Sequence, residues 1–151
     1  MLKGIDPLIT PDLLRVLAEM GHGDEIVVAD ANFTAQSLAR GRPVLALPGV
    51  GVKRATVAVL SLLPLDAAVA RPVAYMQVGD TPAGYRSALQ REVIDAIASI
   101  GPATSDQCEA IERFAFYQRV QRAFAIVHTG ELQPFANFVF KKGVIGEPLK
   151  P

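Results

Sequence analysis

The 151-residue chain is half hydrophobic and formally neutral, because 15 Lys and Arg residues balance 15 Asp and Glu residues. It is long enough for one well-packed domain, and its scattered basic residues lack the charge pattern of a protein that binds nucleic acid or a membrane surface. Because no apolar stretch reaches the roughly 20 residues of a membrane span, the N-terminus does not resemble a signal peptide, and Cys108 is the single cysteine, we expect a cytoplasmic protein.

Short β-branched or aromatic runs, which predict strands, alternate along the chain with segments of helical periodicity. In chain order, we expect a helix over residues 10–20, a strand over 25–29, a strand over 44–47, a helix over 52–63, a strand over 72–78, a helix over 85–100, a helix over 112–123, a strand over 124–128 and a strand over 137–143. Thr10 can cap the first helix, and Gly101 followed by Pro102 stops the third. This alternation predicts a single α/β domain over residues 1–145, with helices packed on a mixed sheet in three layers (α/β/α). Residues 146–151 are predicted to form a flexible C-terminal tail.

Three common kinds of site are poorly supported by the residues. PGVGVKR, over residues 48–54, looks like a glycine-rich phosphate loop at a helix start, but it lacks the GKS or GKT ending, and an ordinary turn explains its glycines. Two histidines and one cysteine, far apart in the sequence, show no metal-ligand spacing, so we expect no metal. Cys108 also lacks the local signature of a catalytic nucleophile.

The segment MGHGDEIVVAD combines three features that suit a binding site. His22 stands between two glycines, which permit unusual backbone shapes, and histidine can pass protons near neutral pH without a cofactor. Asp30 follows the strand over residues 25–29, at a carboxyl end where α/β sheets form their binding crevice. From spacing alone, however, an exposed loop histidine and a turn-forming aspartate are the simpler interpretation.

A second group of polar residues lies in the segment ERFAFYQ. Arg113 and Tyr117 are four residues apart and share a helix face, where a guanidinium and a phenol suit the hydroxyls of a sugar. The same pattern is typical of an ordinary solvated helix edge, so both interpretations stay open. Asp66, after LLPL, is either a third polar anchor or a turn former.

Three motifs, MGHGDEIVVADANF, RFAFYQRVQRAFAIVHTGE and PFANFVFKKG, resemble in order and spacing those of the fucose mutarotase and ribose pyranase family. The resemblance spans nearly the whole chain and is closest to the fucose mutarotase branch. It implies a cofactor-free isomerase that interconverts the anomers or ring forms of a monosaccharide, with an L-fucose-like sugar expected first. It also implies a homo-oligomer, often a ring, with sites near subunit contacts.

The resemblance assigns expected roles to individual residues. His22 matches the proton-donating histidine, and Tyr117 is a candidate catalytic partner. The residues that the resemblance implies for sugar binding are Asp30, Asp66, Arg113, Phe135 and Asn137. The family's YxN element becomes Phe135, Ala136 and Asn137 here, so an apolar face is kept and one hydroxyl is lost.

Two expectations about assembly and activity follow. We expect His22 and Asp30 to line one pocket near the carboxyl end of strand 25–29, with Arg113 or Tyr117 from the same or a neighbouring subunit. The run Phe138 to Phe140 could need a second subunit to bury both of its faces, unless it is a central strand covered within the chain. A ribose pyranase and a non-catalytic monosaccharide-binding module or regulator are the alternative functions.

Overall fold

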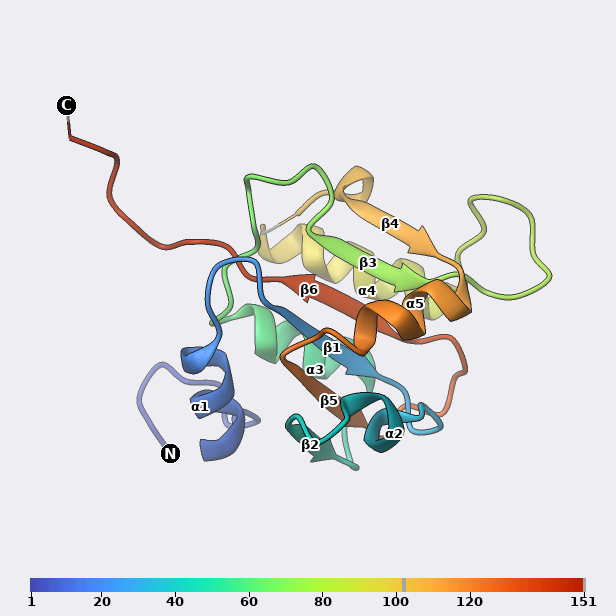
Figure 1. Ribbon diagram of the computed structural model, residues 1–151, viewed down its shortest axis with the longest axis horizontal. Coiled ribbons are helices and arrows are strands. Elements are labelled where there is room, and N and C mark those ends of the chain that lie inside the picture. The colour runs from blue at the N-terminus through green and yellow to red at the C-terminus, as the bar shows by residue number, and fades with distance from the viewer. Residues whose placement is uncertain (102, 151) are drawn as a thin grey trace.

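Figure 1 shows the computed structural model, which describes residues 1–101 and 103–150. In chain order the elements are α1 (Pro11–Glu19), β1 (Glu25–Ala29), α2 (Ala35–Ala39), β2 (Val44–Leu47), α3 (Val52–Leu60), β3 (Val73–Met76), α4 (Ala88–Ile100), the 3-10 helix η1 (Ser105–Gln107), β4 (Cys108–Ile111), α5 (Arg113–Val120), β5 (Ala125–Thr129) and β6 (Phe138–Lys141). None of the helices in the described residues is long and apolar enough to cross a membrane.

Six strands form one mixed sheet in the order β2-β5-β1-β6-β3-β4. The last strand, β6, is inserted between β1 and β3 and runs antiparallel to both, whereas the other neighbouring pairs are parallel. The amino end of β6 therefore lies beside the carboxyl ends of β1 and β3. This arrangement brings residues before β6 to the end of the sheet at which α/β proteins form their binding crevice.

Helices cover both faces of the sheet, so the predicted three-layer α/β/α arrangement is confirmed. Side chains of α1, α3 and α4 pack with Ile26 and Val28 on one face. Those of α2 and α5 pack with Val27 and Ala29 on the other face, and Figure 1 shows α2 and α5 in front of the sheet with α3 and α4 behind it. Because successive side chains of a strand point to opposite faces, the run EIVVA buries apolar residues in both layers.

The run Phe138 to Phe140 is fully buried within the single chain. It forms most of β6, which lies between β1 and β3 and has helices packed on both of its faces. These elements of the same chain bury its side chains. The alternative of a central strand is therefore correct, and this run gives no argument for a second subunit.

The boundaries of several helices differ from the predicted ones for local reasons. The helix expected from residue 85 begins at Ala88, because Ser87 accepts a hydrogen bond from the N–H of Gln90 while the Gln90 side chain accepts one from the N–H of Ser87, a capping box. It ends at Gly101, whose left-handed φ of 88° suits glycine, while Pro102 lies outside the described residues. The helix expected over 52–63 ends at Leu60.

Three elements were absent from the expected list, namely the 3-10 helix η1, the helix α2 and the strand β4. The five-residue helix α2 has no side-chain cap and too few residues to show a period. The edge strand β4 pairs only with β3, and the run CEAI is too short and too polar to signal a strand. Their formation depends on tertiary contacts rather than on local propensity.

Candidate functional site

A buried carboxylate and a buried amide meet at the carboxyl end of β1. The backbone N–H of Asp30 donates to Asn137 Oδ1 at 2.9 Å, and Asn137 Nδ2 donates to Asp30 Oδ2 at 2.9 Å. Asp30 is 4% exposed and Asn137 is 2% exposed. The two residues lie 107 positions apart in sequence and meet because Asn137 precedes β6, which pairs with β1.

The electrostatic environment of Asp30 is unusual for a carboxylate. Burial raises the pKa of Asp30 above its usual value, although hydrogen bonds, the strongest of them from Asn137, oppose the shift. Its other oxygen, Oδ1, accepts from the backbone N–H of Asn32 at 3.0 Å. Both oxygens of this buried carboxyl group therefore accept hydrogen bonds from within the chain.

A pocket of about 380 Å³ lies at the carboxyl ends of β3 and β4, and its lining residues include neither Asp30 nor Asn137. Its volume falls within the range of small-molecule sites. Phe135, two residues before Asn137, contributes its ring to the pocket, and the ring edge lies above Gly79. The lining residues are Gln77, Val78, Gly79, Asp80, Glu112, Arg113 and Phe135.

Helix α5 carries Arg113 and Tyr117 toward this region. Glu112 caps the helix by accepting from the backbone N–H groups of Phe114 and Ala115. The Arg113 guanidinium lies 4.7 Å from the Phe114 ring centre, and Arg113 is one of the residues that line the pocket. Tyr117 instead packs edge-on against Phe114, with ring centres 6.2 Å apart, and is not among the pocket-lining residues.

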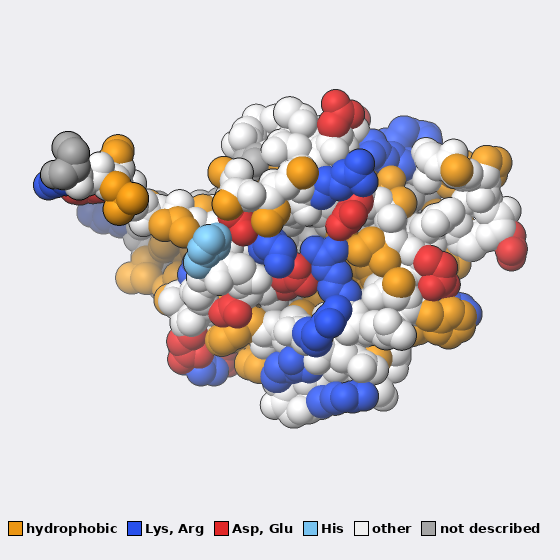
Figure 2. Space-filling model, turned by 45° about the horizontal axis from the view of Figure 1, so that its top comes forward, with side chains coloured by type: hydrophobic (Ala, Val, Ile, Leu, Met, Phe, Trp, Pro, Cys, Tyr) orange, Lys and Arg blue, Asp and Glu red, His pale blue; other side chains and the backbone are white. Residues whose placement is uncertain are grey.

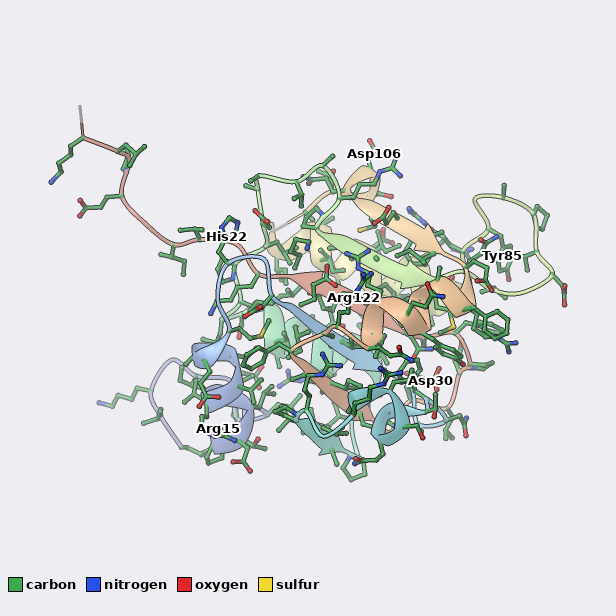
Figure 3. The ribbon with its side chains drawn as sticks, in the orientation of Figure 1. Arg15, His22, Asp30, Tyr85, Asp106 and Arg122 are labelled. Carbon is green, nitrogen blue, oxygen red and sulfur yellow. The ribbon has the colours of Figure 1, made fainter. Side chains whose placement is uncertain are left out.

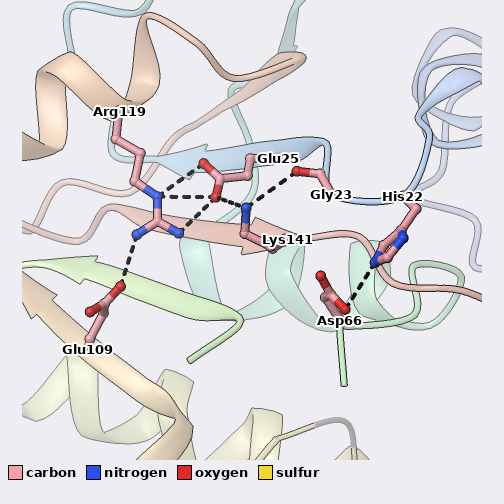
Figure 4. A network of polar contacts seen from close by, with 7 residues as sticks. All are labelled: His22, Gly23, Glu25, Asp66, Glu109, Arg119 and Lys141. Atoms are coloured by element: carbon pink, nitrogen blue, oxygen red, sulfur yellow. Dashed lines mark hydrogen bonds and ion pairs between the residues drawn. The ribbon is translucent and has the colours of Figure 1, made fainter. Parts of the chain in front are cut away.

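His22 lies at the opposite end of β1 and contacts a different acid. Its Nε2 is 3.2 Å from Asp66 Oδ1, while its side chain is 53% exposed (Figure 4). Asp66 is 4% exposed. The backbone N–H of Ala68, together with His22, holds the pKa of Asp66 below its usual range although burial opposes the shift. The pair has the form of a carboxylate that orients an imidazole.

The prediction that His22 and Asp30 line one pocket is wrong within a single chain. Figure 3 shows the two side chains at different ends of β1. The five residues of β1 alone span roughly 16 Å at about 3.3 Å per residue. A residue that precedes a strand and one that follows it lie at opposite ends of the sheet, so the chain carries two separate polar groups.

The position of Asp66 depends on Gly143, which sequence reasoning missed. Gly143 N–H donates to the carbonyl of Pro64 at 2.8 Å, and the N–H of Asp66 donates to the carbonyl of Lys141 at 3.0 Å. A Cβ at position 143 would lie 2.4 Å from the carbonyl oxygen of Leu65. Glycine is therefore required for the segment between α3 and β3 to lie this close to the end of β6.

A network of ion pairs lies next to the His22 end of the sheet (Figure 4). Arg119 Nη2 is 2.8 Å from Glu25 Oε1 and its Nη1 is 3.1 Å from Glu109 Oε1, while Lys141 Nζ is 3.0 Å from Glu25. Figure 2 shows such basic side chains interleaved with acidic ones over this face of the molecule. Burial opposes the charge on Glu25, but hydrogen bonds from Arg119 and Lys141 hold its pKa below the usual value. The network ties β1, β4, β6 and α5 together.

Three other candidate sites have no support in the described residues. The carboxylate of Glu131 lies 3.1 Å from where a Cβ of Gly51 would be, so the start of α3 already has an anion beside it, and PGVG forms an ordinary turn. Within residues 1–101 and 103–150, no three His, Cys, Asp or Glu side chains are grouped to hold a metal ion. Burial raises the pKa of Cys108 to about 11, which disfavours a reactive thiolate.

Comparison with known proteins places these features in a family. Residues 3–145 match the model of the RbsD / FucU transport protein family. An L-fucose mutarotase of Actinobacillus pleuropneumoniae serotype 5b is 43% identical over 146 residues, which cover 95% of this chain and 97% of that protein. A fucose mutarotase of Bos taurus is 43% identical over 147 residues, covering 96% and 95%. The crystal structure of the fucose mutarotase from Streptococcus pneumoniae in complex with L-fucose superimposes with a TM-score of 0.87 at 36% identity, covering 96% of this chain and 100% of that one.

Proposed function

Since this chain belongs to the RbsD / FucU transport protein family, we propose that it is a mutarotase that interconverts the anomers of a monosaccharide of the L-fucose type. The observation that carries the proposal is the Asp30–Asn137 pair, which Phe135, two residues before Asn137, links to a pocket that Phe135 and Arg113 line. It offers a carboxylate, an amide, a guanidinium and an aromatic face, the groups that bind hydroxyls and the apolar side of a sugar ring.

Mutarotation requires two proton movements and no cofactor. The anomeric hydroxyl loses its proton, the ring oxygen gains one, and the bond between the anomeric carbon and the ring oxygen breaks to leave an open-chain carbonyl. The carbonyl turns about its bond to the next carbon, and the reverse proton movements close the ring. The protein must hold the sugar and supply an acid and a base beside it.

The proton donor in this proposal is His22, and a second copy of the chain brings it to the sugar. A general acid must come within about 3 Å of the atom that it protonates, a distance that the length of β1 excludes inside one chain. His22 is exposed enough to reach another subunit. Exposed apolar side chains stand near both polar groups, Phe114 beside the pocket and Val144 and Ile145 beyond Gly143, and contact between copies would bury them. The proposal therefore includes a homo-oligomer.

Asp66 has a different proposed role from the sugar binding that the resemblance implied. Because it contacts His22 Nε2, it orients the imidazole so that Nδ1 faces the sugar. Tyr117, packed in the aromatic group beside the pocket, is the candidate for the complementary proton transfer or for a hydroxyl contact. Asp30, Arg113 and Asn137 hold the sugar.

The activity is tested by NMR exchange spectroscopy with catalytic amounts of protein and a panel that includes L-fucose and D-ribose. We expect faster anomer exchange for L-fucose and a loss of about a hundredfold or more in His22→Gln, because glutamine can hydrogen-bond but cannot exchange a proton. Saturable binding without faster exchange would favour a binding module or regulator, for which the missing hydroxyl of Phe135 is the specific argument. Faster ring-form exchange of ribose alone would favour a pyranase.

The shared site is tested by mixing two inactive variants, His22→Gln and Asp30→Asn, by unfolding and refolding them together. If one copy supplies His22 and another supplies Asp30, random assembly restores about a quarter of the sites. Each variant refolded alone is the control. The absence of any recovery in a folded mixture, or sedimentation of the parent as a 16 kDa species at micromolar concentration, would contradict the shared site.

The single buried Cys108 fits a reducing compartment, so a cytoplasmic location remains part of the proposal. The predicted absence of nucleic-acid and membrane partners also remains a proposal, as does the division into a domain over residues 1–145 and a flexible tail over 146–151. Residues 144–150 are exposed and form no helix or strand, whereas residue 151 lies outside the described residues.

A further inference from the structure

A fully buried glutamine on α4 joins the two segments that border the proposed sugar pocket. Gln90 is 0% exposed, and its Nε2 donates to the carbonyl of Met76 at 2.8 Å and to that of Phe135 at 3.0 Å. Its Oε1 accepts from the backbone N–H of Ser87 at 3.0 Å. Both amide protons and the carbonyl oxygen of the side chain are therefore used, and each bond reaches a different segment.

The two carbonyls belong to residues next to the sugar-binding groups. Met76 ends β3, and its N–H donates to the carbonyl of Asn137 at 3.0 Å. Phe135 lies two residues before Asn137 and lines the pocket. The side chain of Gln90 thus hydrogen-bonds to Phe135 at one end of the segment over residues 135–137. Asp30, which follows β1, hydrogen-bonds to Asn137 at the other end of this segment.

The backbone of Phe135 needs such support. Its φ is 61°, in the left-handed region that is unfavourable for a residue with a side chain. A conformation of this kind persists only where the surroundings determine it, and it occurs often at ligand sites. The hydrogen bond from Gln90 to the carbonyl of Phe135 is a direct constraint on that conformation.

We propose that Gln90 is a positioning residue that sets the affinity for the sugar by holding Phe135 and Asn137 in place. The inference rests on the proposed function, in which these two residues contact the sugar. It assigns Gln90 no contact with the sugar and no proton transfer. Loss of the two donors should therefore weaken binding through the 135–137 segment and leave the chemistry of His22 unchanged.

The two halves of the Gln90 side chain can be separated by mutation. Gln90→Met has a similar length and removes the donors and the acceptor, whereas Gln90→Glu keeps the acceptor for Ser87 N–H and loses one of the two donors, because a carboxyl buried beside two carbonyl oxygens stays protonated and has a single O–H. Ser87→Ala is the matched control, because it removes the other half of the same capping box and keeps both Nε2 bonds. If the cap alone matters, Ser87→Ala and Gln90→Met should behave alike.

The experiment measures anomer exchange across L-fucose concentrations, together with thermal unfolding and the amide NMR signals of Phe135 and Asn137. We expect Gln90→Met and Gln90→Glu to raise KM about tenfold with kcat within about twofold, the size of a lost hydrogen bond, and to shift both amide signals. Ser87→Ala should lower the stability and leave KM unchanged. An unchanged KM and unshifted signals in a folded Gln90 variant would overturn the inference, and so would an equal rise in KM for Ser87→Ala.

The same measurements distinguish this failure from failure of the proposed function. If the parent protein does not accelerate anomer exchange, the proposed activity is wrong and KM cannot be measured. The effect of Gln90 is then read from the amide NMR signals of Phe135 and Asn137 in the protein without sugar. Those signals should still shift in Gln90→Glu and stay in place in Ser87→Ala. If Gln90→Met does not fold, the comparison of Gln90→Glu with Ser87→Ala tests whether Gln90 positions Phe135 and Asn137. If neither Gln90 variant folds under conditions in which Ser87→Ala folds, Gln90 is a stability determinant and the inference is overturned.

Discussion

Replacing Gly143 with alanine would test how the approach of two backbone segments positions Asp66. The new Cβ would lie 2.4 Å from the Leu65 carbonyl oxygen and 2.9 Å from the Asp66 Cα, whereas ordinary van der Waals contact begins at 3.4 Å. The segment around Asp66 must therefore move by about 1 Å, the shortfall in the closer of these contacts. A shift of that size carries the 3.2 Å contact between His22 and Asp66 beyond hydrogen-bond range.

The expected effects are a loss of stability and a larger loss of activity. Overpacking of this kind costs about 1–3 kcal/mol of unfolding free energy, so the variant should still fold. Misplacement of a catalytic group by about 1 Å can lower a rate by up to about a hundredfold. We expect Gly143→Ala to slow L-fucose anomer exchange by between about tenfold and a hundredfold, measured by NMR exchange beside a thermal unfolding curve.

The control and the double variant make this prediction refutable. Gly146→Ala places its Cβ 3.5 Å from the Val144 side chain, an ordinary contact, and should leave the rate unchanged. In an Asp66→Asn background, Gly143→Ala should cost little further activity, because both changes act through the same pair. An anomer-exchange rate in Gly143→Ala equal to that of the parent would show that the approach of the two segments does not position Asp66 for catalysis. The same conclusion would follow if Gly143→Ala lowered the rate in the Asp66→Asn background by as much as it does in the parent.

Three further predictions concern the pocket, the turn beside β5 and the ion-pair network. Phe135→Tyr restores a hydroxyl to the pocket and should tighten L-fucose binding by about 0.5–1.5 kcal/mol, the value of one hydrogen bond; titration calorimetry showing no gain would count against contact between this ring and the sugar. Gly130→Ala should cost about 3 kcal/mol or prevent folding, because its Cβ would lie 1.9 Å from the Pro48 carbonyl oxygen, whereas Gly49→Ala meets nothing within 4 Å and should be tolerated in thermal unfolding. Because the pKa of Glu25 is lowered in the folded chain, its ionised form contributes stability above the unfolded pKa, and that contribution is lost as the pH falls through the folded pKa. Glu25→Gln should therefore be less stable than the parent at pH 7 in denaturant titrations, and a difference that did not shrink in acid would contradict this account.

Most of the secondary structure and the layered architecture could be predicted from local sequence patterns. The capped helix that begins at Pro11 and the run EIVVA carry strong local signals, because periodicity, caps and β-branched residues act over a few positions. The separation of His22 from Asp30 could also have been predicted from the sequence, because residues that precede and follow one strand lie at opposite ends of a sheet. The motif resemblance suggested one pocket, and a resemblance does not say which groups come from which copy of a chain.

The grouping of distant polar residues, in contrast, depends on the order of the strands in the sheet. The insertion of β6 between β1 and β3 brings Asn137 to Asp30 across 107 positions, and no local pattern predicts that neighbour. The roles of Gly143 and Gln90 likewise depend on what lies opposite them, a carbonyl oxygen in one case and two carbonyl acceptors in the other. Local propensity determines which segments form helices and strands, whereas strand order and close packing determine which distant residues come into contact. A site built from residues of several segments depends on those contacts.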